Sequence, residues 1–140
     1  MPRVIPYLYF DGTCLEAMRW YEQVLGGSLT TLTYGDMPGA PPMSAEDARR
    51  LANAQLVLPD GAVLMASDAP QNLPGAPRHE PMRGFRVNLH YGPDVASVQR
   101  VYAALAVGGT VHMPLQKTFW SQSFGMLVDR YGTGWMLMSD

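Results

Sequence analysis

The chain has 140 residues, a length that suits one domain built around a single hydrophobic core. Hydrophobic residues make up 47% and charged residues 16%, so the composition is that of a globular protein and excludes general disorder. The formal net charge is -2 and the Lys and Arg residues are scattered, which gives no footprint for nucleic acid or an anionic membrane. Because no apolar run approaches the ~20 residues of a membrane span and no secretory signal is present, we expect a cytoplasmic protein.

The only cysteine, Cys14, excludes an intramolecular disulfide and any cluster of several cysteines around a metal. It lies on the apolar stripe of a predicted helix. We therefore interpret it as a small buried hydrophobic residue rather than a nucleophile.

The chain begins with a predicted strand that leads into a helix. Residues Val4 to Phe10 are apolar and aromatic, and Pro6 within them favours an edge strand. Thr13 stands three residues before Glu16, which indicates a capping box at the start of the helix. Apolar residues at helical spacing then continue to Gly26-Gly27, which supplies the left-handed residue that ends a helix.

A strand, a surface excursion and a hairpin complete the first predicted module. Ser28 to Tyr34 is the strand, and the Pro- and Gly-rich residues from Gly35 to Met43 form the excursion. A capping signal at Ser44 opens a short helix to about Leu51. The two hairpin strands and the turn between them are Asn53–Leu58, Ala62–Ser67 and Pro59-Asp60-Gly61.

The second half of the chain repeats the first. Leu25-Gly-Gly-Ser-Leu29 recurs as Val107-Gly-Gly-Thr-Val111, at an offset of 82 residues. The predicted strands and helix of this half are Gly84–Tyr91, Asp94–Val107, Phe124–Asp129 and Gly134–Met138. We expect a single domain of two modules, about 1–68 and 83–140, joined by a connector of about 69–82 that is rich in proline and suited to form a lid. A ligand site between two such repeats is a common consequence.

Several sequence blocks resemble the PhnB-like branch of the vicinal oxygen chelate superfamily, which includes glyoxalase I and bleomycin resistance proteins. The blocks are Pro6-Tyr-Leu-Tyr-Phe-Asp-Gly12, Trp20-Tyr21 with Leu25-Gly-Gly27, Leu64-Met-Ala-Ser-Asp68, and Met113-Pro-Leu-Gln-Lys-Thr-Phe-Trp120 with Phe124-Gly125. The resemblance covers essentially the whole chain. It implies an α+β fold in which two βαβββ modules form a curled mixed sheet, a half-open barrel, around a cleft.

The resemblance also implies where a divalent metal binds in the metal-dependent members. Carried onto this sequence, the four positions fall on Pro6, on or beside Met65, on Arg86 or Asn88, and on or beside Met136. Neither proline nor thioether is a suitable ligand for a hard divalent ion, and arginine repels a cation. We therefore expect no metal and no other cofactor.

The candidate chemistry rests on few residues, and each has a structural alternative. His90 shares one strand face with Arg86 and Asn88 and would suit a general base, or it is a strand-end histidine in solvent. Asp68, at the end of a strand, is either a weak catalytic candidate or a turn or capping residue. The related Asp129 is interpreted as a turn residue.

The aromatic and methionine side chains are candidates for a ligand pocket. Phe119, Trp120 and Phe124 either wall such a pocket or plug the end of a barrel. The ten methionines either form an adaptable apolar pocket or fill the core. Asn53 stands where relatives commonly carry His. The loss of this titratable group weakens the case for acid–base catalysis.

These observations predict a metal-independent binding protein, a homodimer with a small, partly apolar ligand. The bleomycin-resistance relatives act in this way, by sequestration. The predicted ligand-binding residues are Met65, Asn88, Phe119, Trp120, Phe124 and Met136. The alternative is a lyase, isomerase or dioxygenase of the superfamily with a non-standard active site at His90 or Asp68. No glycine-rich nucleotide loop supports the methyltransferase function sometimes attached to this branch.

Overall fold

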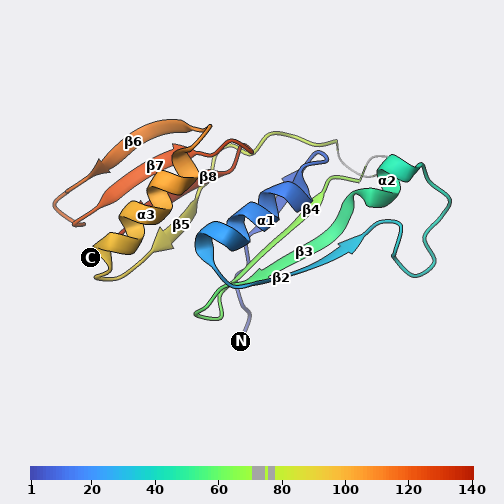
Figure 1. Ribbon diagram of the computed structural model, residues 1–140, viewed down its shortest axis with the longest axis horizontal. Helices are drawn as coiled ribbons and strands as arrows, with labels where there is room; N and C mark the ends of the chain where they lie inside the picture. The colour runs from blue at the N-terminus through green and yellow to red at the C-terminus, as the bar shows by residue number, and fades with distance from the viewer. Residues whose placement is uncertain (71–74, 76–77) are drawn as a thin grey trace. The chain divides into compact units, whose positions relative to one another are not determined.

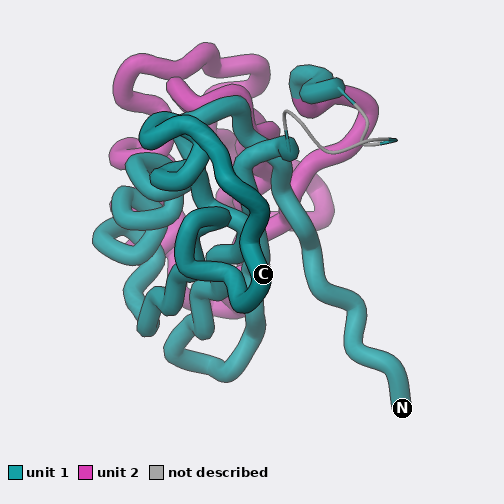
Figure 2. Tube along the Cα trace, turned by 90° about the vertical axis from the view of Figure 1, so that its right-hand side faces the viewer, with its two compact units in different colours: residues 1–81 teal, residues 82–140 magenta. Residues whose placement is uncertain are grey.

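The computed structural model describes residues 1–70, 75 and 78–140. The chain divides into two compact units, residues Met1–Pro81 and Met82–Asp140, which Figure 2 colours separately. The described residues leave out 71–74 and 76–77, near the centre of the predicted connector. The lid expected in this connector includes these residues, and it stays a prediction.

Unit 1 is a four-stranded mixed sheet with one long helix against it (Figure 1). Its strand order is β1-β4-β3-β2, in which β1 pairs with β4 in parallel and the other pairs are antiparallel. In chain order the elements are β1 (Tyr7–Phe10), α1 (Cys14–Leu25), β2 (Ser28–Thr33), α2 (Ala45–Arg49), β3 (Leu51–Val57) and β4 (Val63–Asp68). The predicted edge position of the first strand is confirmed.

Unit 2 has the same architecture without the short helix. Its strand order is β5-β8-β7-β6, with β5 and β8 parallel and the remaining pairs antiparallel. The elements are β5 (Val87–His90), α3 (Val95–Ala106), β6 (Thr110–Gln116), β7 (Phe124–Val128) and β8 (Gly134–Met138). The α+β class and the two βαβββ modules predicted from the repeat are therefore confirmed, with one hydrogen-bonded sheet for each module.

The Gly-Gly pair that marks the repeat has the same two functions in both units. The first glycine, Gly26 or Gly108, has φ of 79° or 73°, a left-handed conformation in which a side chain is strained. The second, Gly27 or Gly109, passes so close to a carbonyl oxygen of the neighbouring strand that a Cβ would overlap it. Glycine is thus required twice, once for the end of the helix and once for the start of the next strand.

Each long helix, α1 in unit 1 and α3 in unit 2, buries one face of its own sheet. The side chains of β1 alternate, with Leu8 and Phe10 buried and Tyr7 and Tyr9 exposed. Fully buried side chains on the helix-facing side of the two sheets include Leu8, Leu56, Leu127, Trp135 and Leu137. The helices add Cys14, Met18, Tyr21, Val98, Val101 and Leu105. In the described part of the chain, neither long helix covers the other face of its sheet.

One local prediction, the capping box at Thr13, was wrong. Thr13 makes no side-chain cap hydrogen bond, so there is no capping box at the start of α1. Instead, Asp68 Oδ1 accepts hydrogen bonds from the backbone N–H groups of Gly12 and Cys14, from a strand more than 50 residues away. A tertiary contact has replaced the local cap, and local spacing alone does not reveal such a contact.

The edge strand β6 was missed because its sequence carries weak strand signals. Pro114 lies within it, and its pairing with β7 is interrupted by two register shifts, between Val111 and Met113 and between Met113 and Gln116. Proline and bulges are tolerated at sheet edges, where one side of the strand has no partner.

Among the described residues, no helix has both the length and the apolar character of a membrane span.

Candidate functional site

We call the sheet face opposite α3 the open face of unit 2. Val87 and Leu89 of β5 are registered with the buried Trp135 and Leu137 of β8, and these side chains point to the helix. Because side chains alternate along a strand, the intervening residues face the other way. The open face therefore contains Asn88, His90, Met136 and Met138, with Met126 and Phe124 of β7 and Met113 of β6 in register beside them.

A row of methionines crosses the middle of the open face. The register joins Asn88 to Met136, Met136 to Met126, and Met126 to Met113, across all four strands of the sheet. The three methionines are half-buried, and so is Met138, which accepts a hydrogen bond at its Sδ from Asn88 Nδ2 at 3.5 Å. Unbranched thioether side chains adapt to differently shaped apolar ligands. The predicted ligand-binding residues Asn88 and Met136 thus lie side by side.

A chain of aromatic rings continues from one end of this face. Phe124 is 7% exposed, Trp120 is 48% exposed and Phe119 is 97% exposed. The Trp120 ring meets Phe124 edge-on at 5.4 Å between centroids and meets Phe119 edge-on at 4.6 Å. The predicted aromatic cluster therefore exists, with Phe124 as its buried base and the other two rings turned outward. Large rings left in solvent in this way suit contact with another apolar group.

Arg86 lies across the other end of the open face. Its Cγ and Nη1 pass 3.3 Å and 3.7 Å from where a Cβ would stand on Gly134, so the missing side chain of this glycine makes room for it. Nη1 donates to the Leu127 carbonyl oxygen at 3.1 Å, and Nη2 lies 3.2 Å from His112 Nδ1. Sequence reasoning treated Arg86 only as a residue that repels a metal and missed its pairing with His112.

The bulge in β6 explains how His112 reaches Arg86. Val111 is registered with Leu127 and Met113 with Met126, which leaves His112 as the extra residue. Such a residue turns out of the ordinary alternation of the strand, and bulges commonly redirect a side chain in this way. An irregular ladder at a proline-containing edge strand is difficult to predict from the sequence.

His90 has both ring nitrogens engaged. The Gly92 N–H donates to Nδ1 at 3.3 Å, so the ring proton of the neutral form lies on Nε2, which is 3.2 Å from Asp140 Oδ1. A general base needs a free nitrogen lone pair directed at a substrate. The base function predicted as one alternative for His90 would therefore require the Gly92 hydrogen bond to break.

Asp68 is 1% exposed, and both of its carboxylate oxygens accept backbone hydrogen bonds. Oδ1 receives the N–H groups of Gly12 at 2.7 Å and Cys14 at 3.1 Å, while Oδ2 receives that of Leu51 at 2.9 Å. This geometry is that of the capping alternative. Asp129 likewise accepts from two backbone N–H groups of its turn and from Trp135 Nε1, which confirms its interpretation as a turn residue.

The corresponding open face of unit 1 is polar and aromatic. Tyr7 and Tyr9 stand 5.1 Å apart between ring centroids, and Tyr34 Oη donates to the Asp68 carbonyl oxygen at 2.8 Å. Burial, followed by the neighbouring Tyr7 phenol, raises the pKa of Tyr34. Met65, predicted to bind ligand, is registered between Tyr7 and Gln55 on this face. It belongs to unit 1, whereas the other predicted ligand-binding residues belong to unit 2.

The residues at the implied metal positions do not suit a divalent ion. The residue registered with Met65 is Tyr7, one position after the Pro6 expected from the sequence, just as Asn88 is registered with Met136. The equivalent positions therefore supply a phenol, a carboxamide and two thioethers, whereas the divalent ions of proteins are held mainly by carboxylate and imidazole side chains. Nowhere in residues 1–70, 75 and 78–140 do three or more His, Cys, Asp or Glu side chains gather as a metal site.

Cys14 is fully buried at the start of α1. Burial raises the pKa of its thiol far above the usual range, and the adjacent Asp68 carboxylate adds to the shift. A thiol that stays protonated is a poor nucleophile. Its predicted role as a buried hydrophobic residue agrees with this environment.

The fold and the sequence define the class of the protein. The family model for the Glyoxalase/Bleomycin resistance protein/Dioxygenase superfamily matches residues 3–137, and the chain belongs to this superfamily. The match spans both units, as expected for a family whose fold is a repeat of one module. The resemblance derived from the sequence blocks is confirmed at this level.

Individual relatives place the chain more closely. It is 31% identical over 144 residues to Protein YjdN of Escherichia coli K12, with 94% of this chain and 91% of that protein covered. The crystal structure of protein PA1353 from Pseudomonas aeruginosa is 40% identical, with a TM-score of 0.84 over 100% of this chain and 98% of that one. A PhnB protein from Bacillus cereus, described as a putative 3-demethylubiquinone-9 3-methyltransferase, shares the fold, with 22% identity, a TM-score of 0.73 and coverage of 99% and 100%.

Proposed function

We propose that the protein binds a small, partly apolar molecule on the open face of unit 2 and that it does so without a divalent metal. The observation that carries this proposal is the row Met136, Met126 and Met113, which is half-buried and lies on the side of the sheet that α3 does not cover. Phe124 and Trp120 extend the same surface. Apolar walls with a polar group among them, here Asn88, are typical of small-molecule sites.

The donor chemistry supports binding without a metal. A ligand held by a chelated ion needs carboxylate or imidazole side chains around that ion, and the equivalent positions carry Tyr7, Met65, Asn88 and Met136 instead. The affinity then has to come from apolar contact and hydrogen bonds. Sequestration of a molecule needs no catalytic residue, so it is compatible with an Asp68 whose oxygens are both occupied by backbone amides.

A fluorescence titration with the neutral probe N-phenylnaphthylamine tests the proposal. Protein treated with EDTA is expected to bind the probe saturably. Met136→Gln, which keeps the length of the side chain and adds a polar amide, should weaken binding by roughly 10-fold, because the amide loses water without gaining a partner. Met37→Gln is the matched control, since Met37 is an exposed methionine of unit 1. Absence of saturable binding, or equal effects of the two substitutions, would contradict the proposal.

The competing function is a lyase, isomerase or dioxygenase, and one observation favours it. His90 Nε2 and Asp140 Oδ1 form a histidine–carboxylate pair at the edge of the same face. Metal analysis of the purified protein separates the two functions. Stoichiometric Zn, Ni, Mn or Fe that only a chelator removes would favour the enzyme, whereas full probe binding by metal-free protein favours sequestration.

A further inference from the structure

Among the residues that the structure describes, Arg86 is a positive charge without a carboxylate partner. Its two hydrogen-bond partners in this part of the chain are neutral, the Leu127 carbonyl oxygen and His112 Nδ1. The described residues include the ion pairs of Arg50 with Asp11 and of His90 with Asp140, and Arg86 takes part in neither. The side chain is half-buried, which makes an unneutralised charge less favourable than it would be in open water.

The guanidinium is also held in place before any ligand arrives. Two hydrogen bonds fix Nη1 and Nη2, and the side chain rests over Gly134, where a Cβ would crowd its Cγ at 3.3 Å. A guanidinium has five N–H donors, so donors remain beyond the two hydrogen bonds that position it. A planar, preorganised fork of this kind matches oxyanions, because little side-chain entropy is lost on binding.

The net charges of the two units also favour an anionic ligand at unit 2. Residues 82–140 contain five Lys and Arg and three Asp and Glu, whereas residues 1–81 contain five and nine. The methionine row lies next to Arg86 on the open face, because Asn88 follows Arg86 by two residues on β5 and is registered with Met136. A cation therefore stands at one end of an apolar surface.

We propose that Arg86 binds the anionic group of the ligand, so that the ligand class is an amphipathic organic anion with a carboxylate, sulfonate or phosphate group on an apolar body. This inference rests on the proposed function for the apolar contacts. Arg86 supplies the positive charge for an oxyanion beside Asn88, the residue registered with Met136. His112 is a positioning residue that holds the guanidinium.

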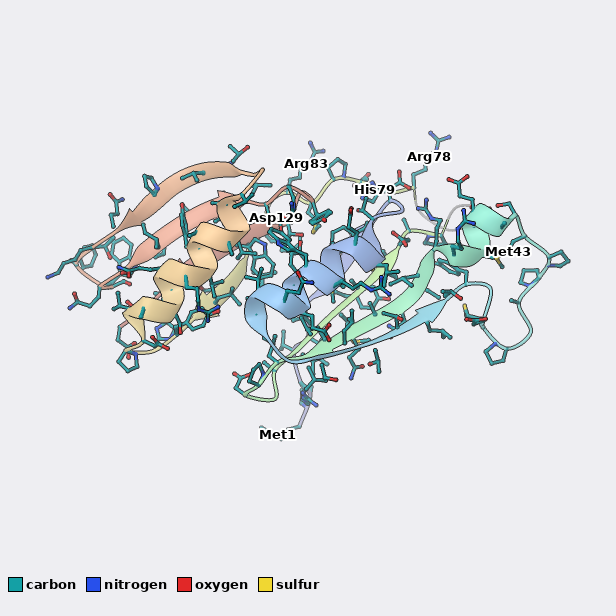
Figure 3. The ribbon with its side chains drawn as sticks, viewed as in Figure 1. Met1, Met43, Arg78, His79, Arg83 and Asp129 are labelled. Carbon is teal, nitrogen blue, oxygen red and sulfur yellow. The ribbon has the colours of Figure 1, made fainter. Side chains whose placement is uncertain are left out.

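The test compares two probes that share one apolar skeleton. Anilinonaphthalenesulfonate carries a sulfonate, and N-phenylnaphthylamine is its neutral counterpart. The native protein is expected to bind the sulfonate about tenfold more tightly, and Arg86→Gln should abolish that preference while changing the affinity for the neutral probe less than about twofold. Arg83→Gln is the control, because Arg83 makes the same charge change from an exposed side chain that extends away from the ribbon (Figure 3).

The outcomes separate this inference from the proposed function. If neither probe binds, the proposed function fails and the inference fails with it. If both probes bind equally well, or if Arg86→Gln weakens both to the same extent, the apolar site stands and Arg86 has only a structural role. Arg86→Lys keeps the charge without the fork and should retain part of the preference. The thermal unfolding temperature of each variant shows whether the variant is folded. Probe binding by a partly unfolded variant is thereby distinguished from binding at the site.

Discussion

Asp68 connects three separate backbone segments of unit 1. Its oxygens accept from the turn before α1, from the first residue of α1 and from the first residue of β3. All three donors are backbone N–H groups, and a buried N–H without an acceptor is costly. The carboxylate therefore fixes the positions of the first residues of α1 and β3 relative to the end of β4.

Asp68→Asn is expected to lower the free energy of unfolding by about 3 kcal/mol, because an amide has only one acceptor oxygen and turns an N–H₂ group toward a backbone donor. Urea unfolding followed by circular dichroism measures the change. Asp36→Asn, at an exposed position of the same unit, is the control and should alter stability by less than about 0.5 kcal/mol. A variant of native stability would show that Asp68 is not a structural cap and would revive its catalytic alternative.

The residue scale is also where sequence reasoning is weakest. Thr13 and Glu16 have the spacing of a capping box, yet the acceptor for the N-terminus of α1 is Asp68. The sequence allowed a capping role for Asp68 but did not reveal what it caps, because its partners Gly12 and Leu51 are 56 and 17 residues away. The Arg86–His112 contact was missed for the same reason, since a bulge creates it.

At the level of elements, Gly125 determines how closely α3 packs on the unit 2 sheet. A Cβ on this residue would stand 2.7 Å from Cε2 of Tyr102 and 3.0 Å from Cδ2 of Leu115. Tyr102 is itself anchored, because its Oη donates to the Met113 carbonyl oxygen at 2.8 Å. The two residues of the Phe124-Gly125 pair therefore have different functions. Phe124 supplies the ring at the base of the aromatic cluster, and Gly125 leaves space for Tyr102 of α3.

Gly125→Ala is expected to destabilise the protein by about 2 kcal/mol through overpacking against Tyr102. The penalty should become smaller in a Tyr102→Leu background, which removes the ring carbon that the new methyl group meets. A double-mutant cycle of urea unfolding measures this coupling. Equal penalties in the two backgrounds would show that the ring does not cause the close contact.

Elements with strong periodic signals were predictable, and irregular ones were not. The two long helices and the hairpin around Asp60 follow from apolar spacing and turn residues, and the structure confirms them. The Gly-Gly repeat identified both modules, because the same close approach to a strand carbonyl recurs at Gly27 and Gly109. By contrast, β6 combines Pro114 with two register shifts, so neither alternation nor propensity marks it as a strand.

At the scale of the whole molecule, the repeat has preserved the fold while the open faces have diverged. Unit 1 presents Tyr7, Tyr9 and Gln55, and unit 2 presents methionines, Asn88 and Arg86. Within residues 1–70, 75 and 78–140, only the open face of unit 2 combines an apolar surface with a cation that has no carboxylate partner. The predicted homodimer and the predicted cleft that would bring Met65 together with Met136 remain predictions.

The most direct test of the account is nuclear magnetic resonance of the protein labelled at its ten methionine methyl groups, titrated with N-phenylnaphthylamine after removal of metal. Binding on the open face of unit 2 should shift the methyl resonances of Met113, Met126, Met136 and Met138 with a common dissociation constant. The resonances of Met37 and Met43, on the excursion of unit 1, should not move. Shifts confined to methionines outside the open face of unit 2, or shifts that appear only after a divalent metal is restored, would contradict the account.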